Sequence, residues 1–250
     1  MLFDRSKRRV GLTQAGKEVL APLERIVIDT EVVISHTRDL AGLRRGRVSL
    51  AVLPSVAAGL LPRALREFTK KNPAIPVQIK DMVTERVIEA VKREDVDFGI
   101  GTRVKADREL TTTPLFTDRL SAFVPKNHPL AVRSRIALKE LTRHPLVLTH
   151  GDSSVREILE LTLKKEKLSV IPAFEVSYMS TVVGLVKAGL GIAILPTIAE
   201  IMEGSSDVVR IEITNPVLNR NVEIIEKKGR SPSHAAGSLL EILGRTTASF

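Results

Sequence analysis

The chain repeats the order of apolar strand, amphipathic helix and apolar strand in two separate series, and this repetition limits the possible folds more than any other feature. Strands that are apolar along their whole length and alternate with helices are typical of a parallel sheet covered by helices on both faces. The sequence therefore predicts two α/β lobes. The expected strands are Val48–Pro54, Val77–Met82 and Val96–Gly101 in the first series, and Pro145–His150, Ile171–Ser177 and Gly191–Pro196 in the second.

Two further segments are expected to connect the lobes. Leu110–Pro125 is extended in character and long enough to pass from one lobe to the other. Asn221–Glu226 can bring the chain back, before a final helix over about Pro232–Arg245. Two lobes joined by crossing strands form a cleft. In open α/β sheets, ligands bind beyond the carboxyl ends of strands and at helix N-termini, so this cleft is the expected ligand site.

A long helix is predicted from about Thr13 to Ala41, with the Thr13 hydroxyl as its N-cap. Apolar residues recur along it at alternating spacings of four and three, which is a heptad seam. A helix of this length cannot bury a broad apolar stripe on itself and needs a partner. We favour a dimerising helix over the alternative, a helix packed along its own globular domain. The seam residues assigned to dimerisation are Val19, Leu23, Ile26, Val33 and Leu40.

The net charge of +9 is denser at the N-terminus than elsewhere. Residues 1–47 hold ten Lys or Arg and six Asp or Glu, a net of +4. A concentration of one sign suits a polyanionic partner such as DNA, and a merely solvated basic face is the alternative. The residues expected to contact DNA phosphates crowd the segment ahead of the long helix, and they are Arg5, Lys7, Arg8 and Arg9.

Several function classes lack support in the composition. The absence of Cys excludes disulfides, thiolate metal sites and a Cys nucleophile, and the five histidines show no metal-ligand spacing. Lys or Arg interrupts every apolar run before it reaches membrane-spanning length, and the N-terminus has no secretory apolar stretch. We therefore expect a cytoplasmic protein with no membrane partner, no metal and no cofactor.

The stretch Thr149–Ser154 contains His, Asp and Ser, which are the residue types of a hydrolase. Catalytic triads converge in space rather than in a row, and the G-x-S-x-G pattern is absent. We interpret the stretch as a strand-to-helix turn, with Ser154 and Glu157 spaced as a capping box. The G-x-G of Gly189–Pro196 precedes a strand, which is the wrong context for a dinucleotide site. No residue is assigned a catalytic role, and an enzyme is not expected.

Short hydroxyl residues recur where the predicted strands end and the helices begin. Together with helix dipoles and one arginine, they suit a small polar or anionic ligand. Each of them alone could instead be a helix cap, as expected for Thr84. The candidate effector-binding residues are Ser55, Thr84, Thr102 and Arg103 on the first lobe, and Thr149, His150, Ser180 and Thr181 on the second.

Several motifs together resemble those of the LysR-type transcriptional regulators, over essentially the whole chain. The most specific is LFDRSKRRVGLTQAG (Leu2–Gly16), which is similar to the family's stretch from the wing of a winged helix-turn-helix into the linker helix. The others are LLPRALREFTKKNP (Leu60–Pro73), VDFGIG (Val96–Gly101), KNHPLA (Lys126–Ala131) and LVKAGLGIAILP (Leu185–Pro196).

The resemblance implies a regulator that binds DNA, senses a small metabolite and assembles as a homodimer or homotetramer. It implies a two-lobed, periplasmic-binding-protein-like α/β effector domain at 48–250, a linker helix at 13–42 and a hinge at 43–47. Lobe I would take about 48–121 and 222–250, and lobe II about 122–221. Residues 1–12 would be a remnant of the winged helix-turn-helix, whose recognition helix would precede Leu2. Phosphate contacts alone do not read sequence, so weak and non-specific DNA binding is expected of this chain.

The main alternative is a solute-binding protein of a transporter with the same two-lobed fold. It is disfavoured because an export signal is missing and a heptad helix precedes the first lobe. An enzyme on this fold comes third. Fold alone does not separate these functions, and the N-terminal 47 residues carry the distinction.

Overall fold

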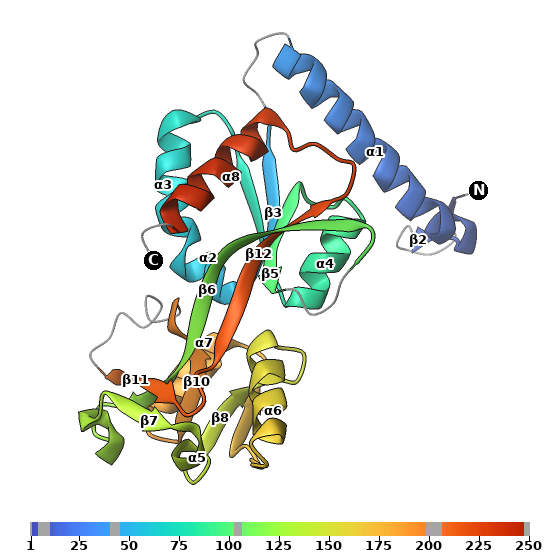
Figure 1. Cartoon of the computed structure of the whole chain (residues 1–250). Helices are drawn as coiled ribbons and strands as arrows, with labels where there is room; N and C mark the ends of the chain where they lie inside the picture. Colours follow the sequence, from blue (N-terminus) through green and yellow to red (C-terminus); the bar gives the residue numbers. More distant parts are fainter. Residues whose placement is uncertain (1, 5–10, 41–45, 103–106, 199–206, 248–250) are drawn as a thin grey trace. The chain divides into compact units, whose positions relative to one another are not determined.

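The computed structural model describes residues 2–4, 11–40, 46–102, 107–198 and 207–247 (Figure 1). The chain divides into two compact units, Met1–Gly46 and Arg47–Phe250. Within the described residues, no helix has the length and apolar character needed to cross a membrane.

The first unit consists of a short strand pair and one long helix. Strand β1 (Phe3–Asp4) pairs antiparallel with β2 (Gly11–Leu12), and helix α1 follows over Gln14–Leu40. The Thr13 hydroxyl accepts a hydrogen bond from the backbone N–H of Gly16 at 3.0 Å, which satisfies one of the free donors at the start of the helix. The four basic residues assigned to DNA phosphates lie outside the described residues: Arg5, Lys7, Arg8 and Arg9.

Helix α1 presents its predicted seam on an exposed surface. The exposed fractions are 38% for Val19, 45% for Leu23, 59% for Ile26 and 63% for Val33. The side chain of Leu40, the last seam residue, lies outside the described part. Leu20, Val27 and Ile34 widen the exposed apolar stripe.

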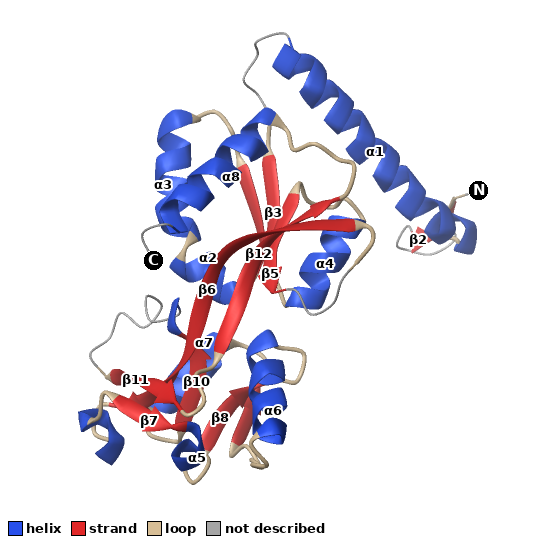
Figure 2. Ribbon diagram, viewed as in Figure 1, coloured by secondary structure: helices blue, strands red, loops and turns tan. Residues whose placement is uncertain are grey.

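Lobe I is a sheet with helices on both faces (Figure 2). Three parallel strands stand in the order β4-β3-β5, because the chain crosses over through helices between them. Helices α2, α3 and α8 pack on one face around Phe68, and α4 covers the other face with Val87. The elements are β3 (Val48–Val52), α2 (Pro54–Gly59), α3 (Leu61–Lys71), β4 (Val77–Asp81), α4 (Thr84–Lys92), β5 (Phe98–Thr102) and α8 (His234–Thr247).

Lobe II repeats this arrangement. Strands β10, β8 and β9 run parallel, α6 packs on one face of them and α7 on the other. Strand β11 pairs with β6 on one side and with β7 on the other, so β7 and β11 extend the sheet from β6. The elements are η1 (Pro129–Val132), β7 (Arg135–Ala137), α5 (Leu138–Leu141), β8 (Leu146–Thr149), α6 (Ser154–Lys165), β9 (Phe174–Val176), α7 (Met179–Lys187), β10 (Ile192–Pro196) and β11 (Val208–Thr214).

Two long antiparallel strands connect the lobes, β6 (Leu110–Pro125) and β12 (Asn219–Lys227). Strand β6 pairs with β12 as far as Arg119, and from Leu120 onward it pairs with β10. The two lobes therefore belong to one hydrogen-bonded sheet. That sheet is mixed rather than purely parallel, since β12 and β6 run against their neighbours.

Helices α2 and α3 are separated at Leu60, just before Pro62, because proline lacks the N–H that would continue the ladder. Two local expectations were wrong. Thr84 is not the N-cap of α4, since Val83 takes that position. Ser154 is likewise the first residue of α6 rather than its cap, and the hydroxyl that accepts the N–H of Val155 belongs to Ser153.

Candidate functional site

A pocket of about 500 Å³ lies between the two lobes of the second unit. Lobe I contributes the start of α2 and the turn from β4 into α4. Lobe II contributes the turn from β8 into α6 and the segment that leads into α7. The lining residues are Leu53, Pro54, Ser55, Ala57, Ala58, Asp81, Met82 and Val83 from lobe I, Thr149, Asp152, Ser153, Ser154, Val155, Ser177, Tyr178, Met179 and Ser180 from lobe II, and Arg220 from β12.

Arg220, which lines the pocket, forms a buried ion pair with Asp118 where the connecting strands pass. Arg220 donates to Asp118 Oδ2 through Nε at 3.0 Å and Nη2 at 2.7 Å, and both side chains are almost fully buried. The same Nη2 donates to Ser55 Oγ at 2.7 Å. Burial lowers the pKa of the Arg220 guanidinium, and the adjacent Asp118 carboxylate opposes that shift. The positive charge of Arg220 is thus already matched within the protein.

Asp118 extends the network to lobe II. Its Oδ1 accepts a hydrogen bond from the backbone N–H of Ile198 at 3.3 Å. Ile198 itself packs into the core of lobe I. The pair therefore connects Ser55 of lobe I, both connecting strands and the segment that follows β10.

Thr149 places a buried and unsatisfied hydroxyl at the pocket. The residue is 7% exposed, and its Oγ1 has no hydrogen-bond partner among the described residues. Leaving a buried hydroxyl without a partner costs free energy, so such groups are rare unless something else binds them. Ser153 and the N-terminus of α6 lie beside it, and the N-terminus of α7 faces the pocket with Ser180. Two helix dipoles therefore direct their positive ends to this side.

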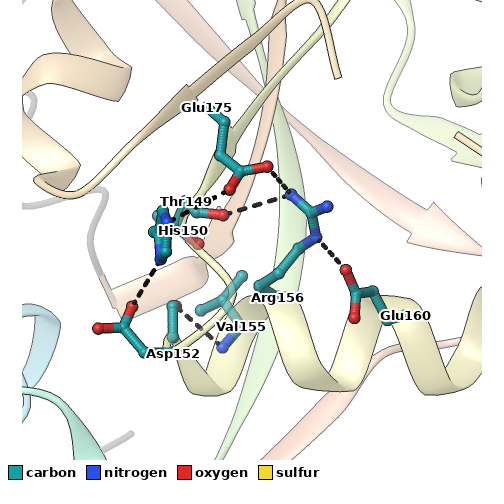
Figure 3. Close-up of polar contacts among 8 residues, drawn as sticks. Thr149, His150, Asp152, Val155, Arg156, Glu160 and Glu175 are labelled. Carbon is teal, nitrogen blue, oxygen red and sulfur yellow. Dashed lines mark hydrogen bonds and ion pairs between the residues drawn. The ribbon is translucent and has the colours of Figure 1, made fainter. Parts of the chain in front are cut away.

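A charged cluster borders the pocket on lobe II (Figure 3). Arg156 of α6 donates to Glu160 at 2.6 Å, to Glu175 of β9 at 3.3 Å and to the backbone carbonyl of Thr149 at 3.4 Å. His150 lies between two carboxylates, 3.7 Å from Asp152 and 3.6 Å from Glu175. Arg156 thus holds the end of β8, and with it Thr149, against α6 and β9.

The structure brings together only part of the predicted effector set. Ser55, Thr149 and Ser180 line the pocket. Thr84 and Thr102 are buried and hydrogen-bonded to each other at 3.0 Å, outside the lining. His150 and Thr181 are also outside the lining, and Arg103 lies outside the described residues.

Sequence reasoning missed the charged residues of the pocket. Asp118 and Arg220 are 102 residues apart, and no local pattern joins them. Asp81 is the last residue of β4, and its position at a strand end is the local signal that could have identified it. Asp152 was interpreted as part of a turn, which it is, although it also faces the pocket. Within the described ranges, no group of three or more His, Asp or Glu side chains could hold a metal ion.

Comparison with known proteins gives a consistent result. Residues 41–248 match the LysR substrate binding domain. The HTH-type transcriptional regulator YbhD of Escherichia coli is 31% identical over 242 residues, which are 97% of this chain and 76% of that protein.

Two solved structures show the same fold. The effector binding domain of QuiR in complex with shikimate has a TM-score of 0.72 at 22% identity, and the comparison covers 82% of this chain and 98% of that one. The BenM effector binding domain with its effector benzoate has a TM-score of 0.70 at 21% identity, with 81% and 92% covered. A transporter's solute-binding protein is not favoured by these relatives. The chain belongs to the LysR family of transcriptional regulators and carries the effector-binding domain of that family.

Proposed function

We propose that a small molecule with an anionic group binds in the pocket between the lobes and that its binding controls transcription. The observation that carries this proposal is the Thr149 hydroxyl, which is buried, lacks a partner in the described protein and lines a pocket shared by both lobes. A ligand oxygen that accepts a hydrogen bond from this hydroxyl would offset the cost of burying it.

The positive ends of α6 and α7 support the assignment of an anionic group to the lobe II side of the pocket. Backbone N–H groups at a helix N-terminus bind carboxylates and phosphates well. Shikimate and benzoate, which the two solved relatives bind, are both carboxylates. Ser55 and Ser180 are proposed to complete the polar contacts from the two lobes.

The proposed mechanism is a shift between lobe arrangements. A ligand that contacts both lobes favours the arrangement in which both sets of contacts are made. Because β6 belongs to the sheet of each lobe, this shift would change the geometry of the whole domain and the spacing of DNA-binding segments in an oligomer. We assign the chain no catalytic role, and we place its action in the cytoplasm, with DNA and a second copy of the chain as partners.

A screen of small carboxylates by thermal shift, followed by calorimetry of any compound that binds, tests the proposal. Thr149→Val removes the hydroxyl at nearly constant volume and is expected to weaken binding about tenfold or more, the effect of losing one hydrogen bond to a charged group. Thr181→Val is the matched control, because Thr181 is exposed and lies outside the pocket. Equal affinity of both variants would contradict the proposed site.

A further inference from the structure

The charges that line the pocket point to a ligand with a positive group as well as an anionic one. Within the described residues, the charged lining groups are Asp81, Asp152 and Arg220. Arg220 is neutralised by Asp118 at 2.7 Å. Two carboxylates therefore remain, and they come from opposite lobes.

Neither carboxylate has its charge matched by a cation of the described protein. Asp81 is exposed at the end of β4, and its carboxylate makes no hydrogen bond or ion pair with another described residue. Asp152 approaches only His150, through Oδ1 at 3.7 Å, which is too long for a hydrogen bond. Figure 3 shows the Asp152 carboxylate beside the His150 ring, and no other dashed contact is drawn to it. Like charges that line one pocket repel each other, and a bound cation relieves that repulsion.

Acidic residues in a cleft are common and do not by themselves make a binding site. The independent sign of a ligand here is the Thr149 hydroxyl, which is more than nine-tenths buried, lines the same pocket and has no partner among the described residues. An anionic group at Thr149 and the N-termini of α6 and α7 would leave the rest of the molecule to extend toward the two carboxylates and the apolar wall. That wall is formed by Leu53, Pro54, Ala57, Ala58, Val155 and Met179.

We propose that the effector is a small zwitterion with the chemistry of an amino acid, whose ammonium group is bound by Asp81 and Asp152 and whose carboxylate is bound at Thr149. This inference rests on the proposed function and adds the ligand class to it. An ammonium group that engages one carboxylate from each lobe also favours closure, because the full interaction exists only when the lobes approach each other. The two aspartates are thus the residues that distinguish an amine from a plain carboxylic acid.

The test compares matched ligands on the full chain. The common L-amino acids are screened by thermal shift, and each is paired with the carboxylic acid that lacks only the α-amino group. We expect at least one amino acid to bind about tenfold or more tightly than its paired acid by calorimetry, since a charge-assisted hydrogen bond contributes at least that factor. Asp81→Asn and Asp152→Asn should each remove most of this preference and leave the affinity for the paired acid equal or higher.

Glu85→Gln is the matched control, because it removes one negative charge on lobe I from an exposed residue outside the pocket, and the preference should persist. If the paired acids bind as tightly as the amino acids, or if both Asn variants keep the preference, the zwitterion proposal is overturned while the effector pocket stands. If neither class of compound binds, both proposals fail.

Discussion

At the scale of single residues, the buried Arg220–Asp118 pair joins the two connecting strands and contacts Ser55. Removing Arg220 would leave the Asp118 carboxylate buried without its cation, which costs about 3–5 kcal/mol for a pair of this kind. We therefore expect Arg220→Ala to lower the free energy of unfolding in urea by about that amount. Arg119→Ala is the control, because Arg119 is mostly exposed beside Glu212 and its ion pair contributes about 1 kcal/mol or less. Similar losses in the two variants would show that burial of the pair does not matter.

His128 makes one part of lobe II sensitive to acid. Burial, and next the nearby ring of His144, lower the pKa of His128 below its usual value of 6.5. Its Nδ1 accepts the N–H of Leu130 at 3.2 Å, which requires that nitrogen to be unprotonated. The unfolded chain therefore binds more protons than the folded chain as the pH falls below about 6.5, and stability decreases in that range.

We expect the urea concentration at the unfolding midpoint to decrease as the pH is lowered from 7 toward the pKa of His128 in the folded state. His128→Asn keeps a short acceptor for the Leu130 N–H and removes the ionisation. The midpoint of this variant should depend less on pH than that of the parent chain. Equal pH dependence in both proteins would exclude His128 as the cause.

At the scale of elements, helix α2 packs closely against the chain that leaves β10. A Cβ on Gly59 would stand 2.5 Å from the carbonyl oxygen of Ile198 and 2.6 Å from its side chain. Gly59→Ala must therefore displace backbone, and we expect a loss of about 1–3 kcal/mol in the free energy of unfolding.

Gly184 in α7 offers the matched comparison, because a Cβ there meets nothing within 4 Å. Gly184→Ala is expected to raise the free energy of unfolding by about 0.4–1 kcal/mol, through the smaller conformational freedom of the unfolded chain. Urea unfolding of both variants checks the sign. If both variants had a lower free energy of unfolding, the loss in Gly59→Ala could not be attributed to the close contact with Ile198.

The local sequence pattern predicted which segments are helices and strands, but it did not predict which side chains from distant segments contact each other. The range Leu110–Pro125 was expected to be extended, and it is the strand β6. The caps expected at Thr84 and Ser154 were each misplaced by one residue, since neighbouring residues compete for such positions. Thr149, which lines the pocket, was predicted because ligands bind at strand ends, whereas Arg220 was not predicted, because its position depends on Asp118 on another strand.

At the scale of the whole molecule, the exposed seam of α1 predicts self-association. Burying an isoleucine stabilises by about 2 kcal/mol in each subunit, so a charge in its place should weaken a dimer at least tenfold. Ile26→Asp is expected to reduce the mass measured by light scattering at micromolar concentration, since Ile26 is 59% exposed on the seam. Glu24→Ala, an exposed change off the seam, should leave the mass unchanged. If Ile26→Asp had the same mass as the parent chain, the α1 seam would not be the surface through which the chain self-associates.

The path of the connecting strands also determines the order in which the lobes can form during synthesis. Every strand of the lobe II sheet is complete once β11 ends at Thr214. Lobe I still lacks β12, which joins β5 to β6, and α8, which supplies Leu239 and Leu243 to its core. During synthesis, the lobe II sheet can therefore form before lobe I is complete, because lobe I still needs the residues of β12 and α8. Until they emerge, the apolar faces of β3 and α3 are not covered by α8, and exposed apolar surface of this kind favours aggregation.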